Sequence, residues 1–309
     1  MLDDLWRETE GRLGAILVSN GANTPVDESF RLVRLRNGVH SVHAMDYGET
    51  MHPGLGPAAE AETLYVEQLG LGGRVANHAG TFVVWDVGLG AAANALALLR
   101  ATAGSSASLQ LVSFDCSLAP LRFASAHCDS LGYFAGYEPR VGQLLDTGRV
   151  AFLNRRQSVD WTTHIGDFPS LLKSTGARWP KPHAIFFDPF SLARNPAMWT
   201  APLFAALFAA LDPARPCSLA TYSRSTMTRV ALLLAGFRVG AGRATGLKEE
   251  TTVAANTPDL ISDPLNRRWL ERARRSGSAE PLWDPAYRQC PLSAETWARL
   301  STHPQFAQT

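Results

Sequence analysis

The feature that most constrains the fold of this chain is an alternation of strand and helix patterns that begins near residue 80. Each strand pattern is a short apolar run, and a segment with helical periodicity follows it. Strands of this kind are buried on both faces, and helical crossovers between them give a parallel sheet. The predicted strands are 81–86, 109–115, 150–153, 184–188 and 218–222, and the predicted helices are 91–101, 118–131, 168–174, 199–211 and 225–235. The sequence therefore predicts a doubly wound α/β fold with a mostly parallel, Rossmann-like sheet.

Segments with other patterns flank this alternation. Residues 30–44 alternate apolar and polar side chains around Asn37-Gly38, which predicts a β-hairpin whose two turn residues have positive φ. A helix is predicted at 58–69, and a closing strand pair at 237–239 and 251–255. After Asn256 the composition shifts to an Arg-rich helix at 265–275 and a tail with spaced Trp and Pro, which either packs as a strap or stays partly ordered. We expect three parts: a hairpin and helical lead-in at 1–79, a central domain at 80–256, and an Arg-rich C-terminal extension at 257–309.

Composition excludes several classes of protein. The chain has 309 residues, of which 46% are apolar and 18% charged, and its net charge is +1, as is typical of a globular enzyme. No apolar run reaches the roughly 18 residues that a membrane helix needs. The N-terminus lacks the pattern of a secretory signal, and the four cysteines lack metal-site or disulfide spacing. We expect a cytoplasmic protein with no metal and no membrane association.

Arginine carries nearly all of the positive charge, and it is clustered at 31–36, 155–156 and 267–275. Arginine binds phosphate bidentately and stacks on bases, so such clusters can hold RNA. The alternative is that a GC-rich coding sequence favours Arg over Lys, and the sequence leaves both open.

The strongest local motif lies at the end of the first predicted strand, where Asp86-Val-Gly88-Leu-Gly90 precedes a helix. Glycines let the backbone approach a ligand closely, and a helix N-terminus offers free N–H donors. Dinucleotide enzymes use a longer pattern with a third glycine, and here Ala93 stands at that position. An acid at Asp86 would repel a pyrophosphate but can pair with the ammonium of a methionine moiety. The motif therefore favours S-adenosylmethionine over a nicotinamide cofactor.

Two further acids follow strands. Asp115 ends the second strand, where a carboxylate can accept both hydroxyls of a ribose; the alternative is an N-cap of the next helix. Asp167 lies in a Gly-Asp loop, where it can accept the exocyclic amine of adenine or cap the helix that follows. The local pattern leaves these alternatives open.

The fourth strand ends in Asp188-Pro189-Phe190. In an open α/β sheet, ligands bind at the carboxyl ends of the strands. A carboxylate, a proline that donates no hydrogen bond and an aromatic face suit an amine on a nucleobase. The alternative is that Asp188 caps a turn and Phe190 packs in the core. We expect Asp188 and Phe190 to be catalytic and Pro189 to contact the substrate.

These segments together resemble the methyltransferase part of the MnmC family, whose bifunctional bacterial members complete 5-methylaminomethyl-uridine at the tRNA wobble position. The resemblance covers about residues 28–256. It is carried by the runs Glu62-Thr-Leu-Tyr65-Val, Asp86-Val-Gly-Leu-Gly-Ala-Ala-Ala-Asn94, Asp188-Pro-Phe-Ser-Leu-Ala-Arg-Asn195-Pro196-Ala-Met-Trp199 and Thr221-Tyr-Ser…Arg229…Ala235-Gly236-Phe237.

The resemblance implies a class I methyltransferase fold, S-adenosylmethionine as the methyl donor, and 5-aminomethyl-(2-thio)uridine in the tRNA anticodon loop as the acceptor. The cofactor contacts it implies are Glu62, Asp86, Gly88, Gly90, Asp115 and Asp167. Asp188 would lie beside the reacting amine, and Arg229 and Lys248 are further candidates for substrate binding.

The chain departs from the family pattern in three places. The family's flavin-dependent oxidase half has no counterpart in this sequence, so we expect methyl transfer alone, with a separate flavin oxidase supplying the amine. The family's Gly-x-Lys-Arg-Glu segment reads Gly246-Leu-Lys248-Glu249-Glu250, and the extension after Asn256 matches nothing in the family. Two other functions stay open: a methyltransferase of the same fold for a small-molecule or protein amine, and a nicotinamide-dependent oxidoreductase.

Overall fold

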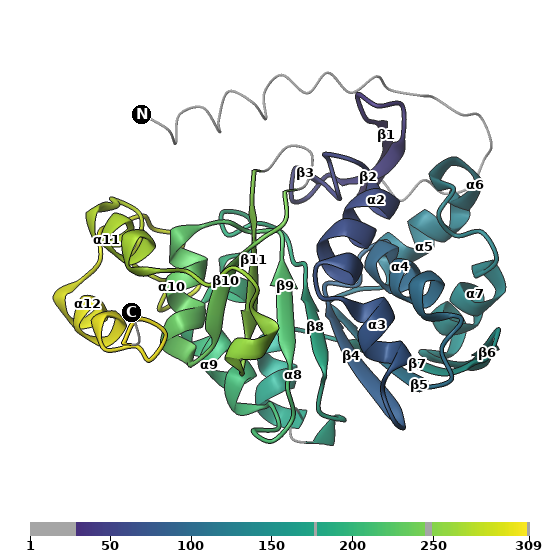
Figure 1. Ribbon diagram of the computed structural model, residues 1–309. Helices are drawn as coiled ribbons and strands as arrows, with labels where there is room; N and C mark the ends of the chain where they lie inside the picture. The colour runs from purple at the N-terminus through teal and green to yellow at the C-terminus, as the bar shows by residue number, and fades with distance from the viewer. Residues whose placement is uncertain (1–28, 176–177, 245–248, 308–309) are drawn as a thin grey trace.

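An eight-stranded sheet forms the centre of the computed structural model, which describes residues 29–175, 178–244 and 249–307 (Figure 1). The strand order is β10-β11-β9-β8-β4-β5-β7-β6. The strands are β4 (Thr81–Val87), β5 (Ser108–Asp115), β6 (Arg149–Asn154), β7 (Gln157–Ile165), β8 (Ala184–Phe187), β9 (Ser218–Thr221), β10 (Arg238–Gly242) and β11 (Thr251–Ala255). Strands β7, β5, β4, β8 and β9 pair in parallel. The predicted doubly wound, mostly parallel sheet is confirmed.

Helices cover both faces of this sheet because successive side chains of a strand point to opposite faces. Along β4, Phe82 and Val84 belong to one buried core, and Val83 and Trp85 to the other. The first core contains residues of α2 (Pro57–Ala61), the π-helix η1 (Glu62–Glu67), α3 (Leu71–Ala76), α4 (Ala93–Thr102), α5 (Ala119–Ala126), α6 (Cys128–Leu131) and α7 (Glu138–Thr147). The second contains residues of α8 (Phe168–Thr175), the 3-10 helix η3 (Pro196–Trp199), α9 (Ala201–Ala209) and α10 (Thr226–Ala235).

A small three-stranded antiparallel sheet lies above the carboxyl ends of the central strands, formed by β1 (Phe30–Arg34), β2 (His40–Ala44) and β3 (Glu49–Thr50) (Figure 1). The predicted hairpin is confirmed, with Phe30 opposite Ala44. The predicted turn geometry is wrong, because only Gly38 has a positive φ, of 87°. The Leu35 amide instead donates to the Val39 carbonyl at 2.8 Å across a longer loop, and such loops need a single left-handed residue.

The edge near β6 differs from the sequence prediction. The segment predicted as the third parallel strand is β6, which pairs antiparallel with β7. Strand β7, which pairs in parallel with β5, and helix α7 were not predicted. Strand β7 places Val159 and Trp161 in the core between half-exposed polar residues, so it has no continuous apolar run. Strands buried on one face alternate in this way.

The predicted closing strands at the other edge do pair. They are β10 and β11, and the antiparallel β11 lies between β9 and β10.

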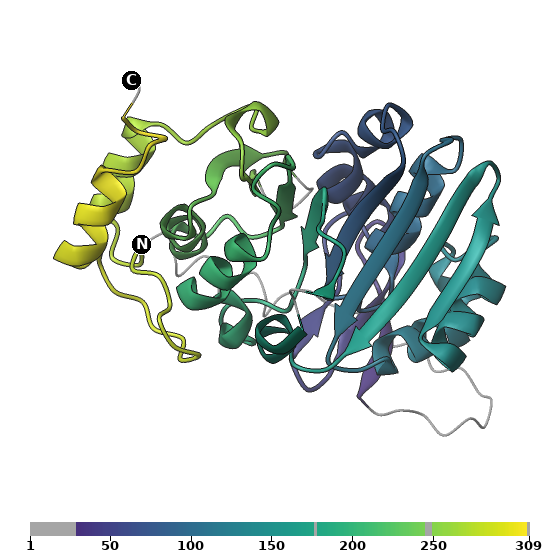
Figure 2. The ribbon, with the colours of Figure 1, turned by 90° about the horizontal axis from the view of Figure 1, so that it is seen from below.

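The C-terminal extension packs against the domain rather than lying free of it. It contains the 3-10 helix η4 (Pro258–Leu260), α11 (Arg267–Arg275) and α12 (Ala294–Ser301). Trp269 of α11 stacks on Phe306, and both belong to the second core. Gln305 accepts a hydrogen bond from the Val239 amide at 2.8 Å and donates to its carbonyl at 2.7 Å. Figure 2 shows this segment in yellow, at the end of the molecule far from β6. Within the described ranges, no helix has both the length and the apolar character needed to cross a membrane.

Candidate active site

Three aspartates lie together at the carboxyl ends of the central strands, because these strands are parallel neighbours. Asp86 lies near the end of β4, Asp115 ends β5, and Asp188 follows β8, and β4 pairs with both of the other strands. The charges of Asp188 and Asp115 both contribute to raising the pKa of Asp86, so the three carboxyl groups share one environment. This is the edge where open α/β sheets bind ligands.

The glycines of the motif let two backbone segments approach each other. Gly88 has a φ of 93°, and a Cβ atom there would lie 2.6 Å from the carbonyl oxygen of Asp188. No L-residue with a side chain could adopt this arrangement without a shift of the loop after β8. Gly90 has a φ of 51°, and its amide donates to Asp115 Oδ2 at 2.8 Å. The turn after β4 is thereby joined to the ends of both β5 and β8.

Asp86 is fully buried. Its Oδ2 accepts a hydrogen bond from Ser113 Oγ at 2.9 Å, whereas its Oδ1 has no hydrogen-bond partner among the residues that the structure describes. Burial raises the pKa of Asp86 to about 8, with Asp188 and Asp115 adding to the effect. A buried acceptor without a partner is costly unless a ligand satisfies it. Its place beside the glycine turn fits a cofactor that carries an ammonium group.

The other predicted cofactor contacts have different surroundings. Asp115 also accepts from the Ser117 amide at 3.4 Å, as a capping residue would, and burial raises its pKa. Asp167 is exposed and caps α8, because its Oδ2 accepts from the Ser170 amide at 3.1 Å and from its hydroxyl at 2.6 Å. The Glu62 carboxylate makes no hydrogen bond or ion pair to any described residue, and burial raises its pKa. Their contacts to the cofactor stay predictions.

Asp188 is held through one of its two oxygens. Asn94 Nδ2 donates to Asp188 Oδ2 at 2.7 Å, and His52 Nε2 lies 3.3 Å from the same atom. The buried Tyr65 hydroxyl meets no partner in ideal hydrogen-bonding geometry among the described residues, but it lies close enough to Asp188 that the charge of this carboxylate and hydrogen bonding to it add to the effect of burial and raise the Tyr65 pKa. Asp188 Oδ1 makes no hydrogen bond within the described part of the chain. The side chain is 15% exposed, so this oxygen is available to a substrate.

The loop that carries Asp188 is fixed from two sides. The Tyr222 hydroxyl donates to the Pro189 carbonyl at 2.9 Å, and Trp199 Nε1 donates to the Phe190 carbonyl at 2.8 Å. From the small sheet, Tyr47 stacks on Phe190 with ring centres 3.9 Å apart. Tyr47 therefore occupies one face of the ring that was predicted to stack on a base.

The two predicted basic substrate contacts do not join this cluster. Arg229 is 2% exposed, and its guanidinium donates to Thr252 Oγ1, the Thr251 carbonyl and Glu250 Oε1 at 2.8–3.0 Å. Its prediction as a substrate contact is corrected accordingly: a buried guanidinium needs such partners, and here they fix β11 to α10. Lys248 lies outside the described residues.

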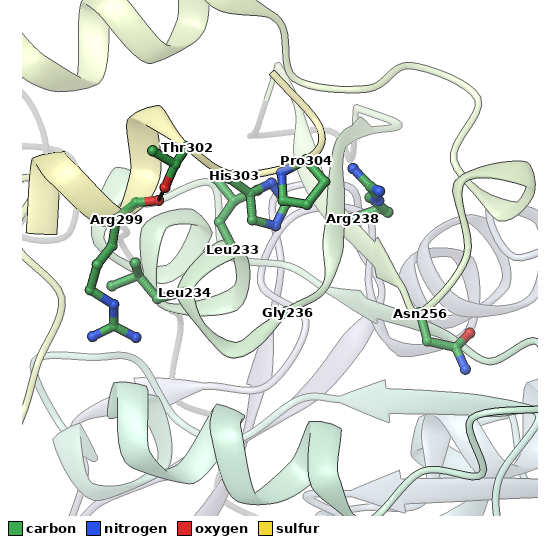
Figure 3. A pocket seen from close by; sticks show the side chains of 9 residues that line it. All are labelled: Leu233, Leu234, Gly236, Arg238, Asn256, Arg299, Thr302, His303 and Pro304. Atoms are coloured by element: carbon green, nitrogen blue, oxygen red, sulfur yellow. Dashed lines mark hydrogen bonds between the residues drawn. The ribbon is translucent and has the colours of Figure 1, made fainter. Parts of the chain in front are cut away.

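Two hollows in the structure lie at the opposite end of the sheet. One, of about 340 Å³, is lined by Arg238, Arg299 and His303 among others, where α12 meets the end of α10 (Figure 3). The other, of about 670 Å³, is lined by Arg74, His183 and their neighbours. Both open near the amino ends of the parallel strands, away from the aspartates. Among the described residues, no group of His, Cys, Asp and Glu side chains is arranged to hold a metal.

Sequence analysis missed several residues that shape this site: His52, Asn94, Tyr47, Tyr65 and Glu49. Asn94 and Tyr65 lie within motifs already identified, so their positions carried a signal. Glu49 accepts a hydrogen bond from the Ser191 amide at 3.0 Å, and it belongs with Tyr47 and His52 to a stretch for which the sequence predicts no helix or strand. No local pattern reveals that this stretch reaches the end of β8.

Comparison with known proteins identifies relatives of this arrangement. Residues 144–257 match a family described as S-adenosyl-L-methionine-dependent methyltransferase. The chain is 30% identical over 210 residues to the tRNA 5-methylaminomethyl-2-thiouridine biosynthesis bifunctional protein MnmC of Pseudomonas syringae, an alignment that covers 62% of this chain and 30% of that protein. It is 29% identical over 252 residues to the protein of the same name from Aeromonas hydrophila, covering 75% and 34%. The chain spans about a third of the length of these relatives.

A solved structure supports the same fold. The crystal structure of MNMC2 from Aquifex aeolicus matches with a TM-score of 0.66 and 21% identity, covering 92% of this chain and 90% of that one. The agreement extends over nearly the whole of both chains, so the two proteins share one fold.

Proposed function

Because the chain carries an S-adenosylmethionine-dependent methyltransferase domain of the MnmC type, we propose that it methylates the amine of 5-aminomethyl-(2-thio)uridine at the wobble position of tRNA. The product is 5-methylaminomethyl-(2-thio)uridine. The observation that carries the proposal is Asp188 on a loop that touches the glycine turn after β4: its Oδ2 is held, and no described residue hydrogen-bonds to its Oδ1. A flavin-dependent oxidase that supplies the acceptor amine belongs to the same proposal.

The cofactor would lie along the ends of β4 and β5. S-adenosylmethionine, when bound, supplies a methyl group on a positively charged sulfur. Asp86 Oδ1 would accept a hydrogen bond from the ammonium group of the cofactor, and Asp115 would accept hydrogen bonds from the ribose hydroxyls. Gly88 and Gly90 would let the cofactor approach the backbone closely. Glu62 and Asp167 would complete the contacts.

The acceptor would lie against the loop after β8. Asp188 Oδ1 would accept an N–H of the amine and so aim the nitrogen lone pair, while Pro189 and Phe190 line the place of the base. Holding the two reactants in line can supply much of the rate enhancement. The carboxylate also favours the positive charge that develops on the nitrogen.

Helix α11 supports an RNA substrate. Its arginines are all exposed, whereas Trp269 and Leu270 face the core. No salt bridge among the described residues involves these arginines, and Glu271 is the one acid of the helix. The charge of Arg272 contributes to lowering the pKa of Arg229 in the first turn of α10. Helix α10 follows β9, and Tyr222, directly after β9, donates a hydrogen bond to the Pro189 carbonyl. The exposed arginines of α11 would bind the phosphates of the tRNA.

Methyl transfer to tRNA carrying 5-aminomethyl-2-thiouridine tests the proposal. We expect turnover with this tRNA and none with the unmodified transcript. Replacing Arg267, Arg268 and Arg272 with Ala should weaken tRNA binding and reduce its dependence on salt by a slope of about 2, since each phosphate contact contributes about 0.7–0.9.

The matched control replaces Arg122, Arg140 and Arg149, which are exposed near the β6 edge, and should leave that slope unchanged. Tight S-adenosylhomocysteine binding with no turnover on this tRNA would rule out the acceptor. Turnover on a free alkyl amine at a comparable rate would favour a small-molecule methyltransferase instead.

A further inference from the structure

His52 makes contacts that the proposed function does not yet use. We propose that His52 acts as a positioning residue: its imidazolium pairs with Asp188 and thereby makes the site select the neutral, nucleophilic form of the acceptor amine. The inference rests on the proposed function for its chemistry, but the pairing itself stands on the structure.

His52 contacts the loop after β8 at one atom, Asp188 Oδ2. Its Nε2 lies 3.3 Å from Asp188 Oδ2 and 3.2 Å from Asn94 Oδ1, and Asn94 Nδ2 donates to the same Asp188 oxygen at 2.7 Å. Three side chains from different segments thus form a closed triangle around Oδ2. Since both donors approach one oxygen, the second oxygen keeps its lone pairs for the substrate.

The backbone around His52 is strained and firmly held. His52 has a φ of 50°, a left-handed conformation that few residues other than glycine adopt and that clusters at functional sites. The Met51 amide donates to the Val42 carbonyl at 2.8 Å. Glu60 accepts from the amides of Gly54 and Leu55 at 2.6 and 2.8 Å. The segment is therefore fixed on both sides of His52, and its imidazole is placed rather than free to turn away.

The charged groups around His52 favour its protonated form. Asp188 faces it from the end of β8 and Glu60 from α2, and its charge is also felt by Asp86 at the end of β4. Burial alone would lower the pKa of His52, but the hydrogen bond and the charge of Asp188 outweigh burial and raise it to about 9. The contact with Asp188 therefore favours the imidazolium form of His52.

This pair changes which form of the amine the site prefers. A primary alkyl amine is mostly an ammonium ion at neutral pH, and an ammonium has no lone pair with which to accept a methyl group. A lone buried carboxylate would bind the ammonium strongly. The imidazolium compensates the carboxylate, so a full charge on the amine gains little, whereas Oδ1 can still accept an N–H from the neutral amine. During methyl transfer the nitrogen carries only a partial positive charge, so the imidazolium disfavours this state less than it disfavours a full ammonium ion.

The kinetic test is the pH dependence of kcat for methyl transfer to aminomethyl-uridine tRNA. His52→Asn keeps a side chain that tolerates the left-handed backbone and can donate a hydrogen bond, but it removes the charge. We expect the acid limb of the kcat profile to move up by about one pH unit or more, with kcat about 10-fold lower at pH 7 and near the wild-type value at high pH. A loss of kcat that is equal at every pH would overturn the proposal, as would an unshifted profile.

The matched control is His43→Asn. His43 lies on β2 and its Nδ1 is 2.9 Å from Thr50 Oγ1, outside the aspartate cluster, and its replacement should leave the profile unchanged.

A second measurement does not depend on the substrate. In an NMR titration of the full chain, we expect the imidazole of His52 to titrate near pH 9, and by at least about one unit lower in Asp188→Asn, where the charge is lost. Titration near 6.5 in the wild type would overturn the pairing even if His52→Asn fails to fold. A wild-type enzyme that does not methylate this tRNA would instead sink the proposed function, and the NMR titration would still decide the pairing.

Discussion

The two ends of the parallel strands carry opposite charge. At the carboxyl ends lie the aspartates 86, 115 and 188 with His52 among them. At the amino ends, Arg74, Arg215, His78 and His183 line the hollow of about 670 Å³ together with one acid, Asp212. The histidines at the two ends respond in opposite directions, because the pKa of His52 rises to about 9 and that of His183 falls to about 4.

Neighbouring charges can therefore reverse the effect that burial has on the pKa of a histidine, or add to it. Burial is the largest single effect on both histidines and lowers the pKa of each. At the carboxyl end Asp188 reverses that effect, while at the amino end the charges of Arg215, His78 and Arg74 add to it. An acidic end suits a positively charged methyl donor and an amine, whereas the basic end would repel both.

The largest expected effect is that of Asp188 on turnover. Asp188→Asn keeps the shape of the side chain and removes its charge, so kcat for methyl transfer to aminomethyl-uridine tRNA should fall by about 10²–10⁴. Binding of S-adenosylhomocysteine, measured by calorimetry, should survive. Asp212→Asn, at the rim of the basic hollow, is the control and should keep full turnover. Near-normal turnover in Asp188→Asn would remove the residue from the mechanism.

A smaller effect is expected on cofactor binding. Asp115→Ala would remove the proposed charge-assisted contact to the ribose, which should weaken S-adenosylhomocysteine binding by roughly 1.5–3 kcal/mol. Because Asp115 also accepts the Gly90 amide, Asp115→Asn serves as a second variant that can keep an acceptor for that amide. An undiminished thermal shift on ligand addition in both variants would show that the ribose lies elsewhere. Asp212→Ala should bind the cofactor normally.

The smallest effect is on the pH dependence of stability. His183 has a lowered pKa in the folded state, so the stability it contributes is complete above about pH 6.5 and is lost as the pH falls toward 4. His52 has a raised pKa, so its contribution is complete below about pH 6.5 and is lost as the pH rises through 9.

Denaturant unfolding across pH measures both contributions. His183→Gln should flatten the acid side of the stability profile by about 1–3 kcal/mol, and His52→Asn should flatten the alkaline side to a similar extent. If both variants changed the same side, the contrast between the two ends of the sheet would be refuted.

Much of the fold and part of the site could be read from local patterns. The strand and helix alternation recovered the central strands, and the acids at strand ends placed Asp86, Asp115 and Asp188 at one edge. These succeed because parallel strands all present their carboxyl ends to the same side. The approach failed at β7, since this strand has one half-exposed face and therefore no continuous apolar run.

The class of fold, the glycine turn and the acids around it follow from the order of the residues, because each is a property of one segment and its own periodicity. The burial of Arg229 against β11, the stacking of Tyr47 on Phe190 and the contact of His52 with Asp188 arise only when the chain is folded. The physical reason is that a side chain's partners are chosen by packing between segments far apart in the chain. Neither the left-handed backbone at His52 nor the hydrogen bonding of Asp188 through one oxygen can be predicted from the spacing of residues in the sequence.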